Sequence, residues 1–444
     1  MDAREVALLT LNACERQGGW SDGVLKKQIA AAGLDSRDAG LATQLCFGVI
    51  QNRILLDFYL SKFSNIPLRR LEGKVLQALR LGLYQMLFLT RIPHSAAVDQ
   101  SVALTRAHCK NPRAPGMVNA ILRNLERSLD RLPTIPEDDP AEYYATLYSH
   151  PVWLVRELLE TLGSEGTAAF LQADNSQPPI TAMVNTVKTD LEGALEALQA
   201  EGVHGEPHPW LKNCLVLSRS GSLEELDAFQ NGLFYVQDPA SRLAVMALDP
   251  EPGSRVLDMC AAPGGKSFAA AIQMKDQGEI WSCDLHPHKK TLIQKGAQRL
   301  GLTCIRPQTA DGKVRRPEWE GTFDRVLVDA PCSGLGVIRK KPDIRFKDPE
   351  PLAGLPQVQS AILDNAAGYV KPGGVLVYST CTILERENRA VTDAFLAAHP
   401  EFRRESFLLP GPAGEVSGGQ ITLWPQVHGT DGFYICKLRK DGEA

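Results

Sequence analysis

Residues 255–267 read RVLDMCAAPGGKS and decide the fold of the C-terminal half. A short apolar run ends at Asp258 and Met259, and a turn of small residues follows before a segment with the length of a helix. Gly264 and Gly265 would let the backbone of this turn approach a ligand closely. The order of strand, glycine turn and helix is typical of the first unit of a doubly wound α/β sheet.

Further short apolar runs follow this turn at regular intervals, and each is separated from the next by a helix-length segment. This rhythm predicts a parallel, Rossmann-like sheet wound with helices from about residue 231 to residue 444. The runs are EIWSCD (279–284), RVLVD (325–329), VLVYS (375–379) and FYICKL (433–438).

Toward the N-terminus the pattern changes twice. Residues 151–230 mix both periodicities, with helices expected at Val152–Leu162 and Leu191–Ala200 and strands at Ile180–Asn185 and Cys214–Leu217, which predicts a small α+β module. Residues 1–130 carry apolar residues at three- and four-residue spacing and no strand-like alternation, so an all-α domain is expected there. The Pro- and Asp/Glu-rich stretch within residues 131–150 is predicted to be a linker. The helical stripes are Leu76, Leu79, Leu83 and Leu87, and Val118, Ile121, Leu122 and Leu125.

Charge is distributed unevenly along the chain. The formal net charge is −4, yet residues 1–127 contain 17 Lys and Arg against 10 Asp and Glu, a net charge of +7. The remaining residues have 31 basic against 42 acidic side chains, because the totals are 48 and 52. Phosphate binding needs a local cationic face, so the helical domain is the better candidate for contact with nucleic acid. A solvated helical surface is the alternative interpretation.

The ten cysteines form no C-x-x-C pair, so the sequence indicates neither a zinc ribbon nor a disulfide framework, and no bound metal is expected. The N-terminus lacks the pattern of a signal peptide, and no apolar run approaches the roughly 18 residues of a membrane span. These features predict a cytoplasmic protein with reduced thiols and no membrane partner. We also expect it to be monomeric.

The glycine turn has three interpretations. It ends in Gly265, Lys266 and Ser267, the last three residues of a P-loop, but Cys260 stands where that pattern requires its first glycine. A purely structural turn is the second interpretation. A ligand site is favoured because Asp284 ends the next predicted strand, twenty residues after Gly264, where an acidic residue can hold ribose hydroxyls.

Two further strand ends carry cysteine, in DAPCSG (329–334) and STCT (379–382). A cysteine inside an apolar strand is usually inert packing. Just past the carboxyl end of a strand, Cys332 and Cys381 would face the same crevice as the glycine turn, where a thiol can lose its proton and act as a nucleophile. Asp329 would join them there.

With these motifs the chain resembles the cytosine-5 RNA methyltransferases, specifically the Sun/Fmu (RsmB) branch, over nearly its whole length. Residues 1–127 resemble the RNA-binding NusB fold, and residues 151–230 resemble the small RRM-like (ferredoxin-like) unit of these enzymes. The matching segments are DMCAAPGGK (258–266), CD (283–284), AD (310–311), DAPCSG, VIRKKPDIR (337–345), STCT, EN (387–388) and WPQVHGTDGF (424–433), with YVQDPAS (235–241) before the methyltransferase fold.

The resemblance implies a role for each of these residues. Cys381 would be the nucleophile, Asp329 would contact the target base, and Cys332 would assist breakdown of the covalent adduct. The cofactor would be S-adenosyl-L-methionine, with Asp284 at its ribose and Asp311 at its adenine. Its methionine part would be lined by Cys260, Ala261, Ala262, Pro263, Gly264, Gly265 and Lys266, and Asp329 also borders the cofactor.

Small-subunit (16S) ribosomal RNA is the expected partner, because the branch carries the NusB-like domain. The basic side chains of Arg339, Lys340, Lys341 and Arg345 follow the Cys332 motif and are expected to hold RNA phosphates. A transfer-RNA methyltransferase and a non-catalytic RNA-binding assembly factor are the alternatives. The target cytosine must be single-stranded or flipped out, since a thiol cannot reach a stacked base.

Overall fold

The computed structural model describes residues 1–17, 20–218 and 221–442, and it divides into two compact units. The first unit is Met1–Ser176 together with Ile338–Lys347, and the second is Gln177–Val337 together with Asp348–Ala444. The chain thus leaves the second unit after Val337, contributes ten residues to the first, and returns. Within the described ranges, no helix has the length and apolar character to cross a membrane.

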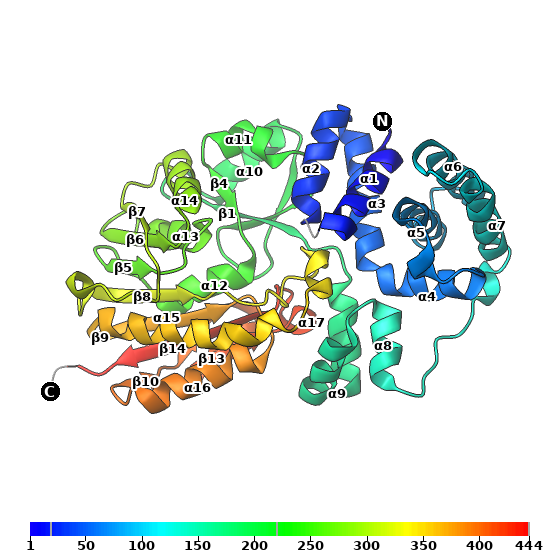
Figure 1. Cartoon of the computed structure of the whole chain (residues 1–444). Coiled ribbons are helices and arrows are strands. Elements are labelled where there is room, and N and C mark those ends of the chain that lie inside the picture. The colour runs from blue at the N-terminus through cyan, green and yellow to red at the C-terminus, as the bar shows by residue number, and fades with distance from the viewer. Residues whose placement is uncertain (18–19, 219–220, 443–444) are drawn as a thin grey trace. The chain divides into compact units, whose positions relative to one another are not determined.

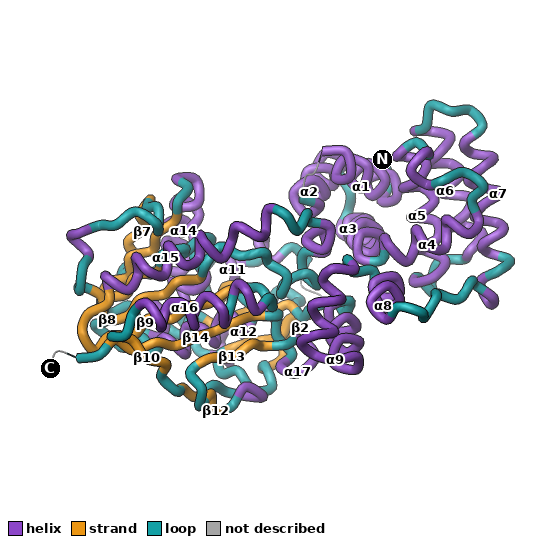
Figure 2. Tube along the Cα trace, turned by 60° about the horizontal axis from the view of Figure 1, so that its bottom comes forward, coloured by secondary structure: helices purple, strands orange, loops and turns teal. Residues whose placement is uncertain are grey.

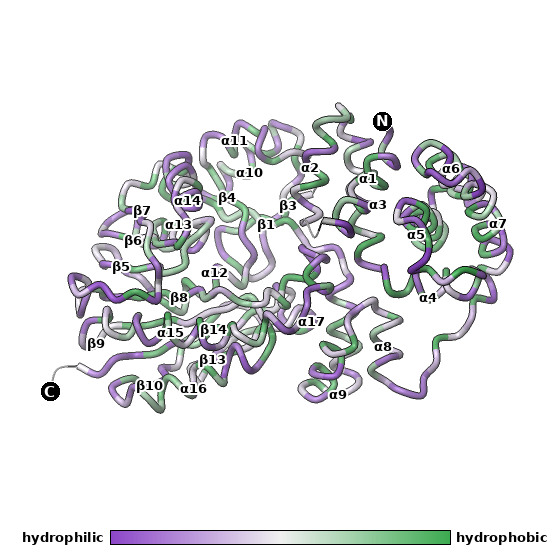
Figure 3. The backbone as a smooth tube through the Cα atoms, in the orientation of Figure 1, coloured by the Kyte–Doolittle hydropathy of each residue, from purple (hydrophilic) through white to green (hydrophobic). Residues whose placement is uncertain are grey.

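The first unit is helical (Figures 1 and 2). The predicted apolar stripes are confirmed, since Leu76, Leu79 and Leu83 are buried and so are all four residues of the second stripe. Hydrophilic and hydrophobic residues are mixed along these helices (Figure 3). The helices are α1 (Ala3–Gln17), α2 (Ser21–Ala32), α3 (Ser36–Gln51), α4 (Arg53–Phe63), α5 (Gly73–Phe88), α6 (His94–His108), α7 (Ala114–Glu126), α8 (Pro140–Tyr148) and α9 (Val152–Asp174).

Helix α5 is the central element of this unit, because every residue from Val75 to Met86 is buried. Arg80 is one of these buried residues, and its side chain is only 4% exposed. Its guanidinium pairs with Asp57 Oδ2 at 2.6 Å and with Glu15 Oε2 at 3.1 Å. Buried charges persist only when they are paired in this way. The sequence predicts that one face of this helix is buried, whereas the structure buries all of its faces.

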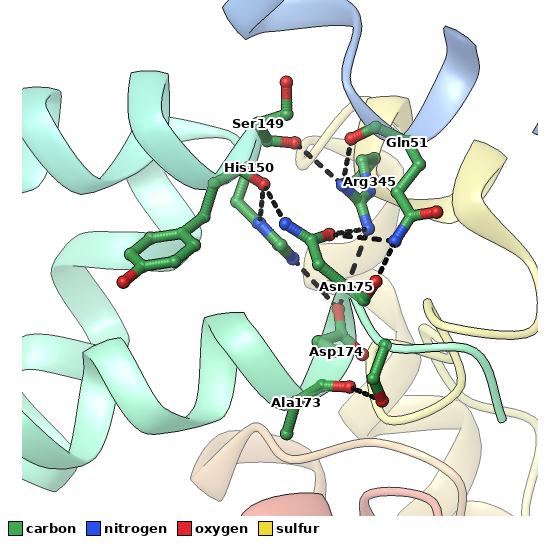
Figure 4. A network of polar contacts seen from close by, with 9 residues as sticks. Gln51, Ser149, His150, Ala173, Asp174, Asn175 and Arg345 are labelled. Carbon is green, nitrogen blue, oxygen red and sulfur yellow. Dashed lines mark hydrogen bonds and ion pairs between the residues drawn. The ribbon is translucent and has the colours of Figure 1, made fainter. Parts of the chain in front are cut away.

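The segment Ile338–Lys347 packs into the first unit through a short 3₁₀ helix at Pro342–Phe346. Arg345, in this helix, is 1% exposed. Its Nη1 donates to the backbone oxygens of Gln51 (2.6 Å) and Ser149 (3.0 Å), and its Nη2 donates to Asn175 Oδ1 (3.1 Å), as Figure 4 shows. Burial lowers the pKa of Arg345 to about 10, an effect that Asp174 partly offsets.

The expected phosphate contact by Arg345 is therefore wrong. A guanidinium sealed inside the helical unit and bonded to three protein oxygens cannot reach an RNA backbone. Its role is to fix the inserted segment among α3, α8 and α9. The RNA contacts expected of Arg339, Lys340 and Lys341 stay predictions.

We expect Arg345→Met to destabilise the helical unit by about 3–5 kcal/mol, because removing one partner of a buried charge pair leaves the other uncompensated. The three acceptor oxygens would lose this donor, and Asp174, 3.9 Å from Arg345 Nη2, would keep only its contact with His150. Urea unfolding followed by far-UV circular dichroism measures the loss. Lys341→Met is the matched control, since Lys341 lies exposed in the same segment and should change the free energy of unfolding by less than about 0.5 kcal/mol. Equal stability of the two variants would contradict the assignment.

The second unit begins with a small antiparallel sheet of order β2-β3-β1-β4. Its core contains Ala182, Leu215 and Phe234 from the sheet and Ala194 and Leu198 from α10. The predicted strands and the helix at Leu191–Ala200 are confirmed, whereas the helix expected at Val152–Leu162 is the first half of α9 in the other unit. The elements are β1 (Ile180–Val184), α10 (Leu191–Ala200), β2 (His204–Pro207), β3 (Cys214–Ser218), α11 (Asp227–Gln230) and β4 (Phe234–Val236).

The large sheet of this unit has the strand order β10-β14-β9-β8-β5-β6-β7, with β13 also paired to β14. Strands β5 to β9 are parallel, as predicted, but β14 runs antiparallel to β9, so the predicted strand at 433–438 has the opposite direction. The strands are β5 (Arg255–Asp258), β6 (Glu279–Asp284), β7 (Ile305–Thr309), β8 (Phe323–Asp329), β9 (Val370–Thr380), β10 (Phe402–Arg404), β13 (Gln420–Leu423) and β14 (Phe433–Lys440), and β11 (Phe407–Leu408) pairs with β12 (Glu415–Val416).

Helices cover both faces of this sheet (Figure 1). Successive residues of a strand point to opposite faces, so Val256 packs in one core with α12, α13 and α14 while Leu257 packs in a second core with α15 and α16. The strand order reverses between β5 and β8, and the crevice beyond their carboxyl ends is where such sheets bind ligands. The helices are α12 (Pro239–Leu248), α13 (Gly265–Gln273), α14 (Pro287–Leu300), α15 (Leu355–Tyr369), α16 (Arg389–Ala398) and α17 (Pro425–His428).

Candidate active site

The two cysteines that the sequence places at strand ends lie side by side. Strands β8 and β9 are neighbours, with Asp329 in register with Ser379. The chain beyond each strand therefore starts at the same edge of the sheet and brings Cys332 Sγ to 3.2 Å from Cys381 Sγ. A disulfide requires about 2.05 Å, so the pair consists of two free thiols in contact.

The surroundings of Cys332 favour its protonated form. The hydrogen bond to Cys381 and burial both raise the pKa of Cys332 well above the ordinary value of a thiol. Two interacting thiols lose their protons in separate steps, and the first to ionise is then stabilised by the S–H of the second. Cys332 can donate its S–H to a thiolate at Cys381, which suits Cys381 to nucleophilic attack.

Lys266 supplies positive charge next to this pair. Its Nζ lies 2.7 Å from Asp329 Oδ2 and 3.3 Å from Ser241 Oγ, and its side chain is only 10% exposed. Burial lowers the pKa of Lys266, but the charges of Asp329 and Cys381 outweigh burial and bring the pKa above its ordinary value. Lys266 therefore stays an ammonium ion, and its charge favours a thiolate at Cys381.

Asp329 is fixed by contacts on both carboxylate oxygens. Oδ2 binds Lys266, and Oδ1 accepts a hydrogen bond from Ser379 Oγ at 2.9 Å. The carboxylate is thereby oriented beside the two sulfur atoms, at the edge where the sequence predicts it.

A buried carboxylate that sequence reasoning did not single out holds the two cysteine loops together. Glu387 Oε2 accepts from the backbone N–H of Ser333 and from Gln359 Nε2, both at 2.9 Å. Ser333 Oγ and Thr382 Oγ1 are 2.7 Å apart, which links the loop of Cys332 to that of Cys381. The sequence shows Glu387 only as part of the segment EN (387–388), and its position shortly after STCT is the signal that could identify it.

A pocket of about 450 Å³ opens at this edge of the sheet and reaches both cysteines. It lies within the range of about 300–1,000 Å³ that is usual for small-molecule sites. Its lining combines the apolar side chains of Met259, Val358 and Ile362 with several carboxylates. Of the residues expected to bind a cofactor, the lining contains Cys260, Ala262, Asp284, Asp311 and Asp329.

The remaining expected cofactor residues shape the turn beside the pocket. Gly264 has φ of 114°, and a Cβ there would lie 2.4 Å from the Phe268 ring, so the turn requires glycine. Helix α13 starts at Gly265, and Lys266 is engaged with Asp329 as described above. Asp284, 8% exposed, accepts from the backbone N–H of His286 at 3.1 Å and lies 3.6 Å from Lys289 Nζ.

These features fit a nucleoside-type cofactor with an amino-acid tail. Acidic side chains at the ends of successive strands suit ribose hydroxyls and an amino group, and the apolar walls suit a base. No cluster of three or more His, Cys, Asp or Glu side chains that could hold a metal ion occurs in the described part of the chain.

Asp258, which ends β5 under the turn, is buried and accepts from Ser267 Oγ at 2.7 Å. Burial raises its pKa from 3.8 to about 7, so its neutral form contributes stability that is complete below about pH 3.8 and is lost as the pH rises through 7. We expect the unfolding free energy of Asp258→Asn to rise by about 2 kcal/mol relative to wild type as the pH increases from 5 to 8, because asparagine cannot ionise. Urea unfolding at several pH values measures this difference. A difference that does not change with pH would contradict a buried neutral Asp258.

Comparison with known proteins identifies three regions. Residues 245–439 match the family described as 16S rRNA methyltransferase RsmB/F, residues 1–127 match the NusB family, and residues 150–224 match the ferredoxin-like domain of RsmF/B-like methyltransferases. These matches confirm the predicted succession of an all-α domain, a small α+β module and an α/β methyltransferase domain.

Full-length relatives have the same organisation. The probable ribosomal RNA small subunit methyltransferase B of Bacillus subtilis is 40% identical, covering 99% of both chains. The ribosomal RNA small subunit methyltransferase B of Klebsiella pneumoniae is 34% identical over 92% of this chain and 91% of its own. A crystal structure of PH0851 superposes with a TM-score of 0.80 at 26% identity and covers 99% of both chains. The chain therefore belongs to the RsmB/F family of 16S rRNA methyltransferases, with a NusB-family domain at its N-terminal end.

Proposed function

We propose that this protein methylates carbon 5 of a cytosine in small-subunit ribosomal RNA, through a transient bond between Cys381 Sγ and carbon 6 of the base. The single observation that carries the proposal is the thiol pair, with its 3.2 Å Sγ–Sγ distance, at the end of a cofactor-sized pocket. The names of the full-length relatives support ribosomal RNA of the small subunit as the substrate.

The nucleophile is needed because carbon 5 of cytosine is too electron-poor to accept a methyl group unaided. Attack by the Cys381 thiolate on carbon 6 turns the ring into an enamine, in which carbon 5 carries the reactive electron pair. When bound, S-adenosylmethionine supplies the electrophilic methyl group. Cys260, Asp284 and Asp311, which line the pocket, are the residues that would hold it.

Lys266 and Asp329 act on the charge that develops during addition. Electron density moves from the C5–C6 double bond toward N3 and O2 of the ring when Cys381 adds. Asp329 is placed to contact the polar edge of the base, and the ammonium of Lys266, 2.7 Å from Asp329, stabilises both the thiolate and the charged ring. Their positions are set before the substrate arrives, so they need little rearrangement during the reaction.

Cys332 acts when the adduct breaks down. After methyl transfer, solvent water takes the proton from carbon 5, the C5–C6 double bond forms again, and Cys381 leaves as a thiolate. The protonated Cys332 then donates its S–H to the departing sulfur, which its raised pKa and its contact with Cys381 allow.

Two measurements test the proposal. The purified protein is incubated with methyl-labelled S-adenosylmethionine and either small-subunit or transfer RNA, and bisulfite sequencing then maps methylated cytosines in cells with and without the protein. We expect label in small-subunit RNA and the loss of one or a few 5-methylcytosines from it. Label only in transfer RNA would overturn the substrate, and no label in either RNA would favour a non-catalytic assembly factor.

A further inference from the structure

The helical unit contains a second pocket, of about 380 Å³, which the proposed chemistry does not use. Residues of α1, α3, α4 and α5 line it together with the end of the inserted segment. Its size is also within the usual range for a bound small molecule or nucleotide.

Arg80 and two carboxylates around this pocket neutralise one another, and a third carboxylate is hydrogen-bonded. Arg80 pairs with Glu15 and Asp57, and Glu15 also accepts from the side-chain amide of Gln77. Asp343 accepts from the hydroxyl of Ser21. These carboxylates are occupied by protein donors, so they do not make the pocket a cation site.

Arg53 is the exception among the lining residues. Its guanidinium carbon lies 3.4 Å from the centroid of the Phe346 ring, and no side chain or carbonyl within residues 1–17, 20–218 and 221–442 accepts a hydrogen bond from it. Burial and the neighbouring Arg80 lower the pKa of Arg53, and the charges of nearby carboxylates partly offset this effect. A guanidinium has five N–H donors, and stacking on a ring leaves its edge able to bind a phosphate through two parallel hydrogen bonds.

Trp20 adds a stacking surface to the same pocket. Its side chain is 52% exposed although it lines the cavity, and Lys347 Nζ lies 5.2 Å from the centre of its ring. An exposed indole next to cationic groups is how proteins bind single-stranded nucleic acid, because every base has a flat face that can stack.

We propose that this pocket binds one unpaired nucleotide of the RNA substrate, with its phosphate on Arg53 and its base stacked on Trp20. The inference rests on the proposed function for the identity of the RNA. The helical unit would then bind RNA at a defined nucleotide site, and not only through non-specific attraction by its net positive charge. A nucleotide held here would fix the register of the RNA on the protein, whereas the chemistry takes place at Cys381.

The test measures binding of the full-length protein to transcribed small-subunit RNA by filter binding at fixed salt, without cofactor. Trp20→Ala and Arg53→Met are each expected to weaken affinity about ten-fold, and Trp20→Phe to restore it to within about three-fold. Arg37→Met removes one exposed arginine of the same unit and should stay within about two-fold of wild type. In methyl transfer, the KM for RNA should rise about ten-fold in Trp20→Ala while kcat changes less than two-fold.

Each outcome decides the question. Wild-type affinity in both Trp20→Ala and Arg53→Met overturns the site, and so does an equal loss in Arg37→Met, which would indicate diffuse electrostatic binding. Tight binding of cytidine monophosphate, together with unchanged RNA affinity in the variants, would identify a small-molecule site and also overturn the proposal. Trp20 is exposed, so its variant remains informative if Arg53→Met fails to fold. Failure of the proposed function would be seen in a different experiment, because a variant without Cys381 would then still transfer methyl groups.

Discussion

Cys381→Ala is expected to reduce methyl transfer by at least about 10⁴-fold, the order of loss seen when a covalent nucleophile is removed. The reason is chemical: without a thiolate at carbon 6, carbon 5 of cytosine has no usable electron pair for the methyl group. Affinity for S-adenosylmethionine should change less than about three-fold, because alanine leaves the carboxylates of the pocket in place. Transfer of labelled methyl groups and isothermal titration calorimetry measure the two quantities.

The matched control for this variant is Cys109→Ala. Cys109 is a partly buried cysteine of the helical unit and takes no part in the pocket or the thiol pair. It should retain wild-type turnover, which would show that loss of a cysteine as such is harmless. Residual turnover of Cys381→Ala above about one hundredth of wild type would contradict nucleophilic catalysis by this residue.

Cys332→Ser is expected to convert a transient protein–RNA adduct into a major, long-lived species. Serine holds its proton more firmly than cysteine, and its shorter bond to carbon moves the donor away from Cys381, so the departing sulfur loses its stabilising contact. Adduct formation depends on Cys381 and should continue. The measurement is a denaturing gel, on which the complex migrates more slowly than the free protein.

The double variant Cys332→Ser/Cys381→Ala provides the control, because it lacks the sulfur that would form the bond. It should show no shifted band. A Cys332→Ser protein that turns over at the wild-type rate without any shifted band would remove Cys332 from adduct breakdown.

The strand ends of the site were predictable, whereas the contacts between them were not. Apolar runs of strand length followed by Asp258, Asp284, Asp329 and Cys381 suffice to place these residues at one edge, because parallel strands end together. The pairing of Lys266 with Asp329 joins residues 63 positions apart, on α13 and β8. No local sequence pattern predicts a contact between residues so far apart in the chain. The sequence alone is equally compatible with Lys266 as a cofactor ligand.

Buried charges account for a further group of differences between sequence and structure. Glu387, Arg80 and Arg345 are each almost fully buried, although residues of their type are normally exposed. Their burial depends on partners that lie far away in the sequence, such as Gln51 and Asn175 for Arg345. From the sequence of a basic run alone, an arginine that donates to protein acceptors cannot be distinguished from one that binds an RNA phosphate.

The inserted segment Ile338–Lys347 bears on how the protein can be divided. Removing residues 1–176 would strip Ile344, 3% exposed, and Arg345 of the helices that cover them and leave an apolar, charged loop directly after the Cys332 motif. A cut at residue 176 therefore divides one packed unit, because ten residues of that unit lie beyond it in the chain.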